Sequence, residues 1–259
     1  MRDPGLSEAI DAVGGVSELA RRIGIAQPSV SNWNRVPADR VVAVETATGV
    51  SRMRLRPDLY SEGFVAGDVD EIDSERAQEY ALLAALLARA PSSALLKQLA
   101  KLRGDASPLG LAHMGLGEAA EAATSPAQVE REYFDLFIGV GRGEILPYAS
   151  YYLTGFLNER PLSRLREDLA ELGIERAEGN FEPEDHAATL CEIMAGLVGR
   201  RFPAPENAQR ELFEKHIAPW MGRMFAEMES SSAAKFYRSV GTLGRVFLEI
   251  ETEAFALAD

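Results

Sequence analysis

The chain has 259 residues, 46% hydrophobic and 8% aromatic, so it can bury a core and is not a disordered chain. Its 27 basic and 40 acidic residues give a net charge of −13. The single cysteine, Cys191, excludes an intramolecular disulfide framework and multi-cysteine metal sites, and the three histidines lie too far apart for a metal-ligand motif. The N-terminus resembles no secretory signal, and the longest charge-free stretch, residues 145–158, is too short to span a membrane. We expect a soluble cytoplasmic protein without membrane insertion.

The charge is divided unevenly along the chain. Residues 1–60 hold eight arginines, no lysine and seven acids, a net charge of +1, whereas residues 61–259 hold 19 basic and 33 acidic residues, a net charge of −14. Such a difference predicts two modules with different partners. The acidic, glycine-containing residues 61–74 are predicted to link a domain at residues 1–60 to a domain at residues 75–259.

Apolar residues recur at helical spacing in four segments of the N-terminal module. The first ends at Gly14, the second at Gly24 and the fourth at Gly49. Pro28 lies in the first turn of the third segment, where its missing N–H costs nothing, and Pro37 opens the fourth. These signals predict a domain of four short helices.

The second and third of these helices have the spacing of a helix-turn-helix. Ala20 is small enough for a close helix crossing, Gly24 suits a tight turn, and Val30 and Trp33 provide the buried face of the next helix. On these residues, nearly all of residues 5–57 resembles the Cro/YdaS-type repressor and antitoxin domains.

This resemblance implies that the helix around residues 27–34 enters the major groove of DNA. The residues expected to face the bases are Gln27, Ser29, Ser31, Asn32 and Arg35. The arginines expected to hold phosphates are Arg21, Arg22 and Arg40. The opposite interpretation stays open, because a helix-turn-helix can serve as a packing module, +1 is weakly basic, and an acidic neighbour repels DNA.

The rest of the chain is predicted to be an all-helical bundle, since no segment alternates like a strand. Ser74 is predicted to cap its first helix, Ser125 and Pro126 to open a later one, and Glu132 to lie off the apolar face of that later helix. The remaining helices are expected at residues 95–102, 109–122, 162–172, 185–200, 208–228 and 233–257. The predicted fold is therefore all-α, with a four-helix N-terminal domain and a larger helical bundle.

Three segments stand out within this helical background. They are a Tyr–Phe–Asp–Leu–Phe helix end at residues 133–137 leading to a Pro–Tyr–Ala–Ser–Tyr–Tyr loop at 147–152, the Glu–Pro–Glu–Asp–His run at 182–186, and His216 with Trp220, followed by Phe–Tyr at 236–237. In this order they resemble the TorD/DmsD family of chaperones, over roughly residues 75–259. A domain of the helix-turn-helix type departs from the usual plan of that family.

The resemblance implies a cytoplasmic chaperone for a molybdenum-cofactor oxidoreductase, of the dimethyl sulfoxide reductase or formate dehydrogenase type. The 182–186 run would lie by the groove where the client's twin-arginine signal peptide docks, and carboxylates bind guanidinium groups in a bidentate manner. An alternative stays open for Glu184 and Asp185, because acids are common in the first turn of any helix.

The residues expected to contact the client share polar tips and positions within these segments. They are Tyr148, Ser150, Tyr151, Tyr152, Glu182, Glu184, Asp185, His186, His216 and Trp220. Cys191 lies on an apolar helical stripe and is expected to be a buried, inert thiol. The Gly-rich residues 139–143 lack the ending of a phosphate loop. No catalytic set, metal site or cofactor site can be assembled, so the chain is not expected to be an enzyme.

The sequence is consistent with two functions. In the first, the helical bundle binds the signal peptide or the apo form of its client until the cofactor is inserted. In the second, the chain is a transcription regulator that binds DNA through its N-terminal domain and senses client or cofactor through the bundle. A palindromic operator favours a homodimer, whereas a chaperone can act as a monomer.

Overall fold

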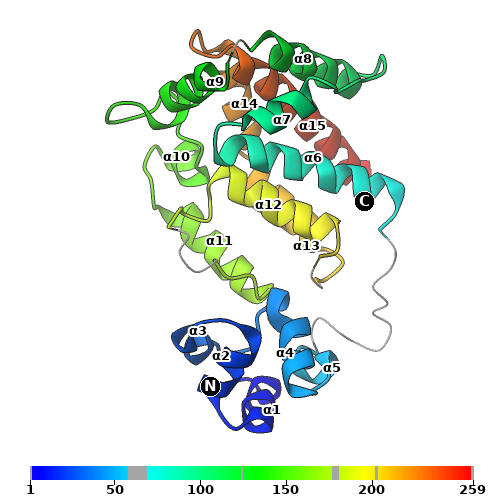
Figure 1. The fold of residues 1–259 in the computed structure, drawn as a ribbon, viewed down its shortest axis with the longest axis vertical. Helices are drawn as coiled ribbons and strands as arrows, with labels where there is room; N and C mark the ends of the chain where they lie inside the picture. Colours follow the sequence, from blue (N-terminus) through cyan, green and yellow to red (C-terminus); the bar gives the residue numbers. More distant parts are fainter. Residues whose placement is uncertain (1, 58–68, 124, 177–180, 202–203, 258–259) are drawn as a thin grey trace. The chain divides into compact units, whose positions relative to one another are not determined.

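The structure is a computed structural model that describes residues 2–57, 69–123, 125–176, 181–201 and 204–257 (Figure 1). Contacts divide the chain into two compact units. Unit 1 comprises residues 1–74, 166–181 and 196–208, and unit 2 comprises residues 75–165, 182–195 and 209–259. Both units are helical, as the sequence predicts, and the described residues hold no strand, only an isolated bridge between Tyr148 and His186.

The N-terminal part of unit 1 consists of short helices around one apolar core. The helices are α1 (Pro4–Val13), α2 (Val16–Ile23), α3 (Gln27–Asn32), the 3₁₀ turn η1 (Ala38–Arg40), α4 (Val41–Thr48) and α5 (Arg52–Leu55). Gly14, Gly24 and Gly49 end their helices with positive φ, as predicted. Val30 and Trp33 lie in the core together with Leu6 and Leu19. Only α5 has no counterpart among the predicted helices.

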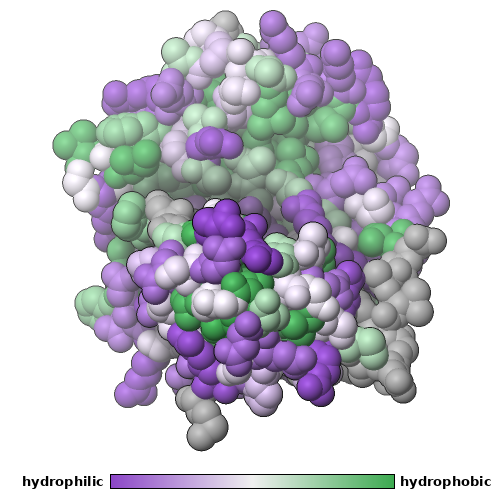
Figure 2. Space-filling view, turned by 60° about the horizontal axis from the view of Figure 1, so that its bottom comes forward, coloured by the Kyte–Doolittle hydropathy of each residue, from purple (hydrophilic) through white to green (hydrophobic). Residues whose placement is uncertain are grey.

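Helices of 5 to 22 residues follow in the rest of the chain. They are α6 (Glu71–Ala88), α7 (Ser93–Leu99), α8 (Pro108–Ala122), α9 (Pro126–Tyr133), the π-helical turn η2 (Phe134–Ile138), α10 (Ala149–Thr154), α11 (Arg160–Glu171), α12 (Ala187–Val198), α13 (Ala208–Leu212), the π-helical turn η3 (Phe213–Ile217), α14 (Met221–Ser230) and α15 (Phe236–Leu257). None of the described helices is long and apolar enough to cross a bilayer. Figure 2 shows hydrophilic and hydrophobic side chains interspersed on the face that it displays.

Helix α15 forms the centre of unit 2, where it packs against α14, α8 and α9 (Figure 1). Two glycines allow α14 to approach closely. A Cβ atom at Gly244 would lie 2.4 Å from the ring of Phe225, and one at Gly241 would lie 2.8 Å from the carbonyl oxygen of Phe225. Larger residues at these two positions would therefore separate the helices.

Two buried carboxylates hold α15 in place. Glu132 on α9, predicted to lie off the apolar face, is in fact only 8% exposed. Its carboxylate accepts hydrogen bonds of 2.7 to 3.2 Å from the backbone N–H groups of residues 235–237, at the start of α15. This corrects the sequence interpretation, because Glu132 is a long-range cap of a helix that begins about a hundred residues later.

Glu251, near the other end of α15, is 1% exposed. Its carboxylate receives two hydrogen bonds from the Arg76 guanidinium, at 2.7 and 2.8 Å, and one from the Tyr80 hydroxyl at 2.9 Å. Both partners lie on α6. Three donors compensate the removal of this carboxylate from water.

Several predicted boundaries are wrong. Helix α6 begins at Glu71 and not after Ser74, because the carboxylate of Asp70 accepts the N–H of Asp73 and starts the helix earlier. The predicted linker therefore loses its last residues to α6, and its residues 61–68 lie outside the described part of the chain. The single helix expected at residues 208–228 is broken into α13, η3 and α14.

Candidate functional site

Backbone hydrogen bonds join the start of α10 to the residues before α12, all within unit 2. The N–H of Ala149 donates to the carbonyl of Asp185 at 3.0 Å, and the N–H of Ala187 donates to the carbonyl of Pro147 at 2.8 Å. These bonds form the bridge between Tyr148 and His186. The two predicted segments at 147–152 and 182–186 thus meet, although 29 residues separate them in the sequence.

The Asp185 carboxylate caps α10. It is fully buried, and its Oδ2 atom accepts the N–H of Ser150 at 2.8 Å, in the first turn of that helix. The Asp185 Oδ1 and Ser150 Oγ atoms are buried and have no hydrogen-bond partner among the described residues. Ser150 and Asp185 therefore shape the site from inside, and neither presents a surface for a client in this conformation.

Tyr148, Glu182 and His186 form the outer part of the same site. The Tyr148 hydroxyl donates to Glu182 Oε1 at 2.5 Å, and its ring lies edge-on to the His186 ring, with centroids 5.1 Å apart. Burial and the nearby carboxylate of Glu182 raise the pKa of Tyr148. The result is an exposed carboxylate that is oriented by a tyrosine that stays protonated.

His186 is 7% exposed, and burial lowers its pKa despite the nearby carboxylates of Glu182 and Asp185. The N–H of Ala188 donates to His186 Nδ1 at 3.1 Å, so the neutral ring carries its proton on Nε2. The ring is therefore a neutral group with one N–H donor. Glu184, the remaining acid of this run, is partly buried and precedes α12 instead of lying in its first turn.

The expected loop at residues 147–152 is mostly the helix α10, which corrects the sequence interpretation. Tyr151 and Tyr152 leave it on different sides. Arg142 donates to the Tyr151 hydroxyl, and its guanidinium lies 5.0 Å from the centre of that ring. The Tyr152 hydroxyl donates to Glu227 on α14 at 2.5 Å. Tyr152 therefore ties α10 to α14, whereas Tyr151 ties α10 to the loop that carries Arg142.

His216 and Trp220 are both buried, with Trp220 fully enclosed. The Trp220 indole N–H donates to the carbonyl of His216 at 2.6 Å, and its ring lies 5.3 Å from the Tyr152 ring. Both are predicted from the sequence to contact the client, but in this conformation they pack the interior behind α10. Cys191 is also fully buried, and desolvation raises its pKa to about 12, as expected for an inert thiol.

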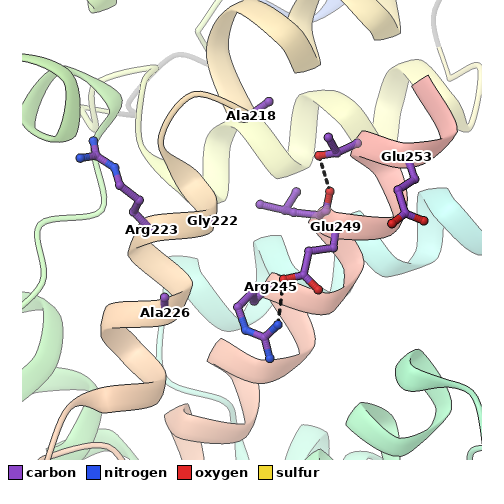
Figure 3. Close-up of a pocket in the computed structure, with 9 residues that line it drawn as sticks. Ala218, Gly222, Arg223, Ala226, Arg245, Glu249 and Glu253 are labelled. Atoms are coloured by element: carbon purple, nitrogen blue, oxygen red, sulfur yellow. Dashed lines mark hydrogen bonds and ion pairs between the residues drawn. The ribbon is translucent and has the colours of Figure 1, made fainter. Parts of the chain in front are cut away.

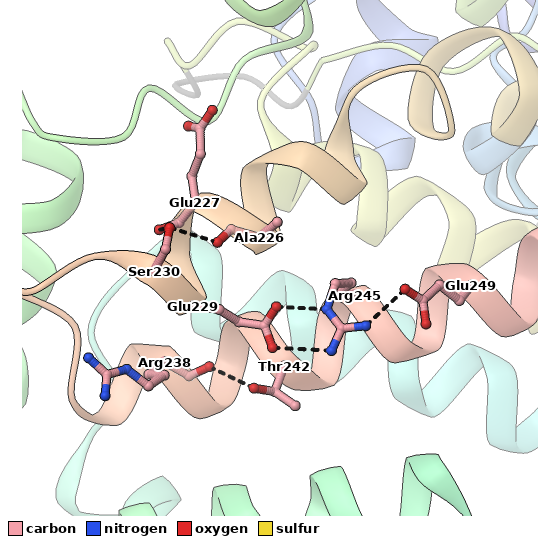
Figure 4. A network of polar contacts seen from close by, with 8 residues as sticks. All are labelled: Ala226, Glu227, Glu229, Ser230, Arg238, Thr242, Arg245 and Glu249. Carbon is pink, nitrogen blue, oxygen red and sulfur yellow. Dashed lines mark hydrogen bonds and ion pairs between the residues drawn. The ribbon is translucent and has the colours of Figure 1, made fainter.

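A shallow groove of about 430 Å³ lies between α14 and α15 (Figure 3). Ala218, Gly222 and Ala226 line the α14 side, and Leu248 and Thr252 line the α15 side. At one end Arg245 donates to Glu229 at 2.7 and 3.3 Å and to Glu249 at 2.8 Å (Figure 4). The Arg245–Glu229 pair links α15 to α14, whereas Glu249 lies on α15 itself, one turn after Arg245.

The residues predicted to read DNA lie on α3 and just beyond it, in unit 1. Gln27 and Asn32 are exposed, Ser29 and Ser31 are partly buried, and the Gln27 amide donates to the Ser31 hydroxyl at 2.7 Å. All four residues lie on the short helix α3. Whether they contact DNA stays a prediction.

The arginines of this domain are largely paired with its acids. Glu18 accepts hydrogen bonds from Arg21 at 2.6 and 2.8 Å and from Arg22 at 2.9 Å, and these bonds lower its pKa to about 2. The same pattern recurs between Glu45 and Arg52. A DNA phosphate would have to compete with a carboxylate for Arg21 and Arg22, which weakens the electrostatic case for DNA binding.

Arg35, predicted to contact DNA bases, instead makes hydrogen bonds within unit 1. Its guanidinium donates to the carbonyls of Ala170 and Glu171, at 2.8 and 2.6 Å, at the C-terminal end of α11. The indole N–H of Trp33 donates to Glu175 at 3.1 Å. An arginine suits the negative end of a helix dipole. Arg35 is therefore a helix cap in this conformation, a role that its neighbours in sequence do not reveal. Arg40, the last predicted phosphate contact, is partly buried.

Two stretches of the chain match known protein families. A family described as the nitrate reductase delta subunit matches residues 102–226, and one described as bacterial toxin YdaS matches residues 6–63. Relatives named chaperone protein TorD include those of Vibrio cholerae, 28% identical over 48% of this chain and 61% of the relative, and of Aliivibrio fischeri, 29% identical over 50% and 65%.

The chain thus spans somewhat less than two thirds of the relatives that it matches. These relatives are named as chaperones. The chain is thus similar to the nitrate reductase delta subunit family over residues 102–226, to the YdaS family over residues 6–63, and over about half of its length to relatives named chaperone protein TorD.

Proposed function

We propose that unit 2 binds the twin-arginine signal peptide or the apo form of a molybdenum-cofactor oxidoreductase in the cytoplasm, before cofactor insertion and export. The observation that carries the proposal is the exposed carboxylate of Glu182, which the Tyr148 hydroxyl holds at 2.5 Å beside the bridge between α10 and the residues before α12. A carboxylate in a fixed orientation binds a planar guanidinium in a bidentate manner at a lower entropic cost than a free one.

The neighbouring groups suit an extended cationic peptide. The buried, neutral His186 ring packs edge-on against the Tyr148 ring and so helps to fix the hydroxyl that orients Glu182. The backbone that carries Glu182 and Tyr148 is joined by the bonds of the bridge, so both sides of the site keep their spacing. In this proposal Ser150 and Asp185 position α10, and they do not touch the client.

The test is a titration of the full chain with twin-arginine signal peptides from molybdoenzymes of the same genome, followed by fluorescence anisotropy. Each peptide is paired with a control in which both arginines are lysines, because a lysine keeps the charge but cannot form the bidentate contact. We expect saturable binding of one peptide and a clear loss with its lysine control. Equal binding of both peptides, or none of any peptide, would contradict the proposal.

A second function rests on the YdaS-type domain. We propose that this domain binds DNA through Gln27, Ser29, Ser31 and Asn32, while Arg35 stays with α11. The exposure of Gln27 and Asn32 on α3 favours this role. The pairing of Arg21 and Arg22 with Glu18 should make the affinity for DNA low. Measured affinity for double-stranded DNA should then fall steeply with salt. An affinity that does not change with salt would contradict DNA binding by this domain.

A further inference from the structure

Within unit 1, the end of α11 holds the loop that follows the predicted DNA-binding helix α3. Residues 170–175 belong to the stretch that matches the nitrate reductase delta subunit family, and residues 33–38 belong to the stretch that matches the YdaS family. Three groups of the loop donate hydrogen bonds to residues 170–175, namely the Trp33 indole, the Arg35 guanidinium and the Ala38 N–H. Side chains and backbone thus join the two stretches.

The contact is closely fitted around Gly173, which follows the end of α11 with a φ of +66°. Its carbonyl accepts the N–H of Ala38 at 2.8 Å. A Cβ atom at Gly173 would collide with Nη1 of Arg56 and would lie 3.0 Å from the backbone nitrogen of Ala38. Arg56 is fully buried, and its Nη1 atom donates to the carbonyl of Val36 at 2.8 Å, so it has little room to move away. A larger residue at position 173 would therefore push the loop away from α11.

The Arg35 guanidinium uses for α11 the nitrogen that a DNA contact would need. Its Nη2 atom donates to the carbonyls of Ala170 and Glu171, at 2.8 and 2.6 Å. A guanidinium binds a guanine edge or a phosphate through two parallel N–H groups. Both such pairs of a guanidinium include Nη2, whose two hydrogens are accepted here by the carbonyls. A bidentate contact with DNA therefore requires Arg35 to leave α11.

The charges of this contact also disfavour DNA. Residues 166–176, at the end of α11 and just after it, hold four acids against two arginines. The Glu175 carboxylate accepts the indole N–H of Trp33 at 3.1 Å, and Trp33 follows directly on α3. The contact therefore places a carboxylate next to the predicted DNA-binding helix, where it repels phosphates.

We propose that the end of α11 is an autoinhibitory segment that withholds Arg35 from DNA. This inference rests on the proposed DNA binding of the YdaS-type domain and adds its regulation. While the loop is held by α11, the domain binds DNA weakly, through the polar side chains of α3 alone. When α11 releases the loop, Arg35 adds a cationic contact and the Glu175 carboxylate moves away, so the affinity for DNA rises.

The test measures binding of the full chain to a short mixed-sequence DNA duplex at low salt, by fluorescence anisotropy. Gly173→Ala breaks the contact without changing any residue of α3. The matched control is Gly155→Ala, because φ is +84° there and the added Cβ would contact nothing within 4 Å, so the backbone is strained without a collision. We expect Gly173→Ala to bind the duplex about fivefold more tightly, with a steeper dependence on salt, and Gly155→Ala to match wild type.

The same comparison in an Arg35→Ala background shows whether Arg35 carries the effect. There, Gly173→Ala should bring almost no gain in affinity, because no arginine is left to release. An equal gain in that background would show that α11 does not act through Arg35. Equal affinities of Gly173→Ala and wild type would show that the contact does not inhibit. Either result overturns this inference, while the proposed DNA binding stands.

A second pair of variants leaves the backbone at Gly173 unchanged and decides the matter if circular dichroism shows that Gly173→Ala is misfolded. Glu175→Ala removes the acceptor of the Trp33 indole, whereas Glu171→Ala removes the same charge from an exposed side chain and keeps the carbonyl that Arg35 contacts. Only Glu175→Ala should raise the affinity for the duplex, and equal affinities of the two variants would overturn the inference. If neither wild type nor any of these variants binds the duplex, the proposed DNA binding fails and this inference fails with it.

Discussion

The acidic residues of the two units differ in burial and in how far away their partners lie in the sequence. In unit 2, Glu132 and Glu251 are buried and fix α15 through partners far away in the sequence. In unit 1, Glu18 and Glu45 lie beside arginines at most seven residues away, at the surface. The excess of acid in unit 2 is therefore partly structural, while the acids of the N-terminal domain offset the cations that a DNA-binding domain needs.

The largest expected effect follows from Glu251→Ala, because this change leaves Arg76 partly buried without its carboxylate. Loss of one partner of a buried ion pair costs about 3–5 kcal/mol. The measurement is urea unfolding in a Trp33→Phe background, where Trp220 is the remaining tryptophan and reports on unit 2. Glu253→Ala, at an exposed position two residues later, is the control and should leave the midpoint unchanged. Equal midpoints for both variants would refute a structural role for Glu251.

Glu132→Ala should have the next largest effect. The backbone N–H groups of residues 235–237 lose their acceptor, at a cost of about 1–3 kcal/mol. Urea unfolding of the same Trp33→Phe background measures it, and hydrogen exchange at the start of α15 should accelerate. Glu130→Ala, on the same helix but exposed, provides the comparison. Unchanged exchange at residues 235–237 would show that another group caps α15.

A smaller effect depends on pH. His113 on α8 lies 2.9 Å from Glu79 on α6, and this hydrogen bond raises the pKa of His113 despite partial burial. A histidine with a raised pKa stabilises the fold below its unfolded pKa, and this contribution is lost as the pH rises through the folded pKa. His113→Gln should therefore cost more stability at pH 5.5 than at pH 8. A difference from wild type that is the same at both pH values would contradict this.

The smallest change is expected from Glu18→Gln, in unit 1. The substitution releases Arg21 and Arg22 from their carboxylate, so affinity for double-stranded DNA at low salt should rise by about a few-fold, with a steeper dependence on salt. Asp11→Asn, an exposed acid on α1, removes the same charge without releasing an arginine. If both variants gain equally, the effect is one of net charge and not of ion pairing.

The sequence predicts features that depend on neighbours along the chain and misses those that depend on distant partners. Gly14, Gly24 and Gly49 end their helices as predicted, and Ser125 caps α9, because each of these signals is local. The sequence does not predict α10, because the side chain that caps this helix belongs to Asp185, 35 residues later. Local periodicity likewise placed Glu132 off the apolar face, because nothing near it reveals the helix that it caps.

The candidate site shows the same division. Tyr148 and Glu182 are both predicted from the sequence as client contacts, and the structure brings them within hydrogen-bond distance. Ser150, Trp220 and Arg35 are also predicted as contacts, but the first two are buried and Arg35 donates hydrogen bonds within the chain. Residue type and spacing select groups with suitable chemistry, but they do not tell which of these groups face solvent.

The most direct test of the account compares Glu182→Gln with Glu18→Gln for binding of the natural twin-arginine peptide to the full chain. Both changes remove one negative charge from an acidic side chain, but only Glu182 belongs to the Tyr148 site. We predict that Glu182→Gln weakens peptide binding by about tenfold and that Glu18→Gln leaves it unchanged. Equal affinities of wild type and both variants would contradict a peptide-binding role for Glu182, and equal losses in both would reduce it to an effect of net charge.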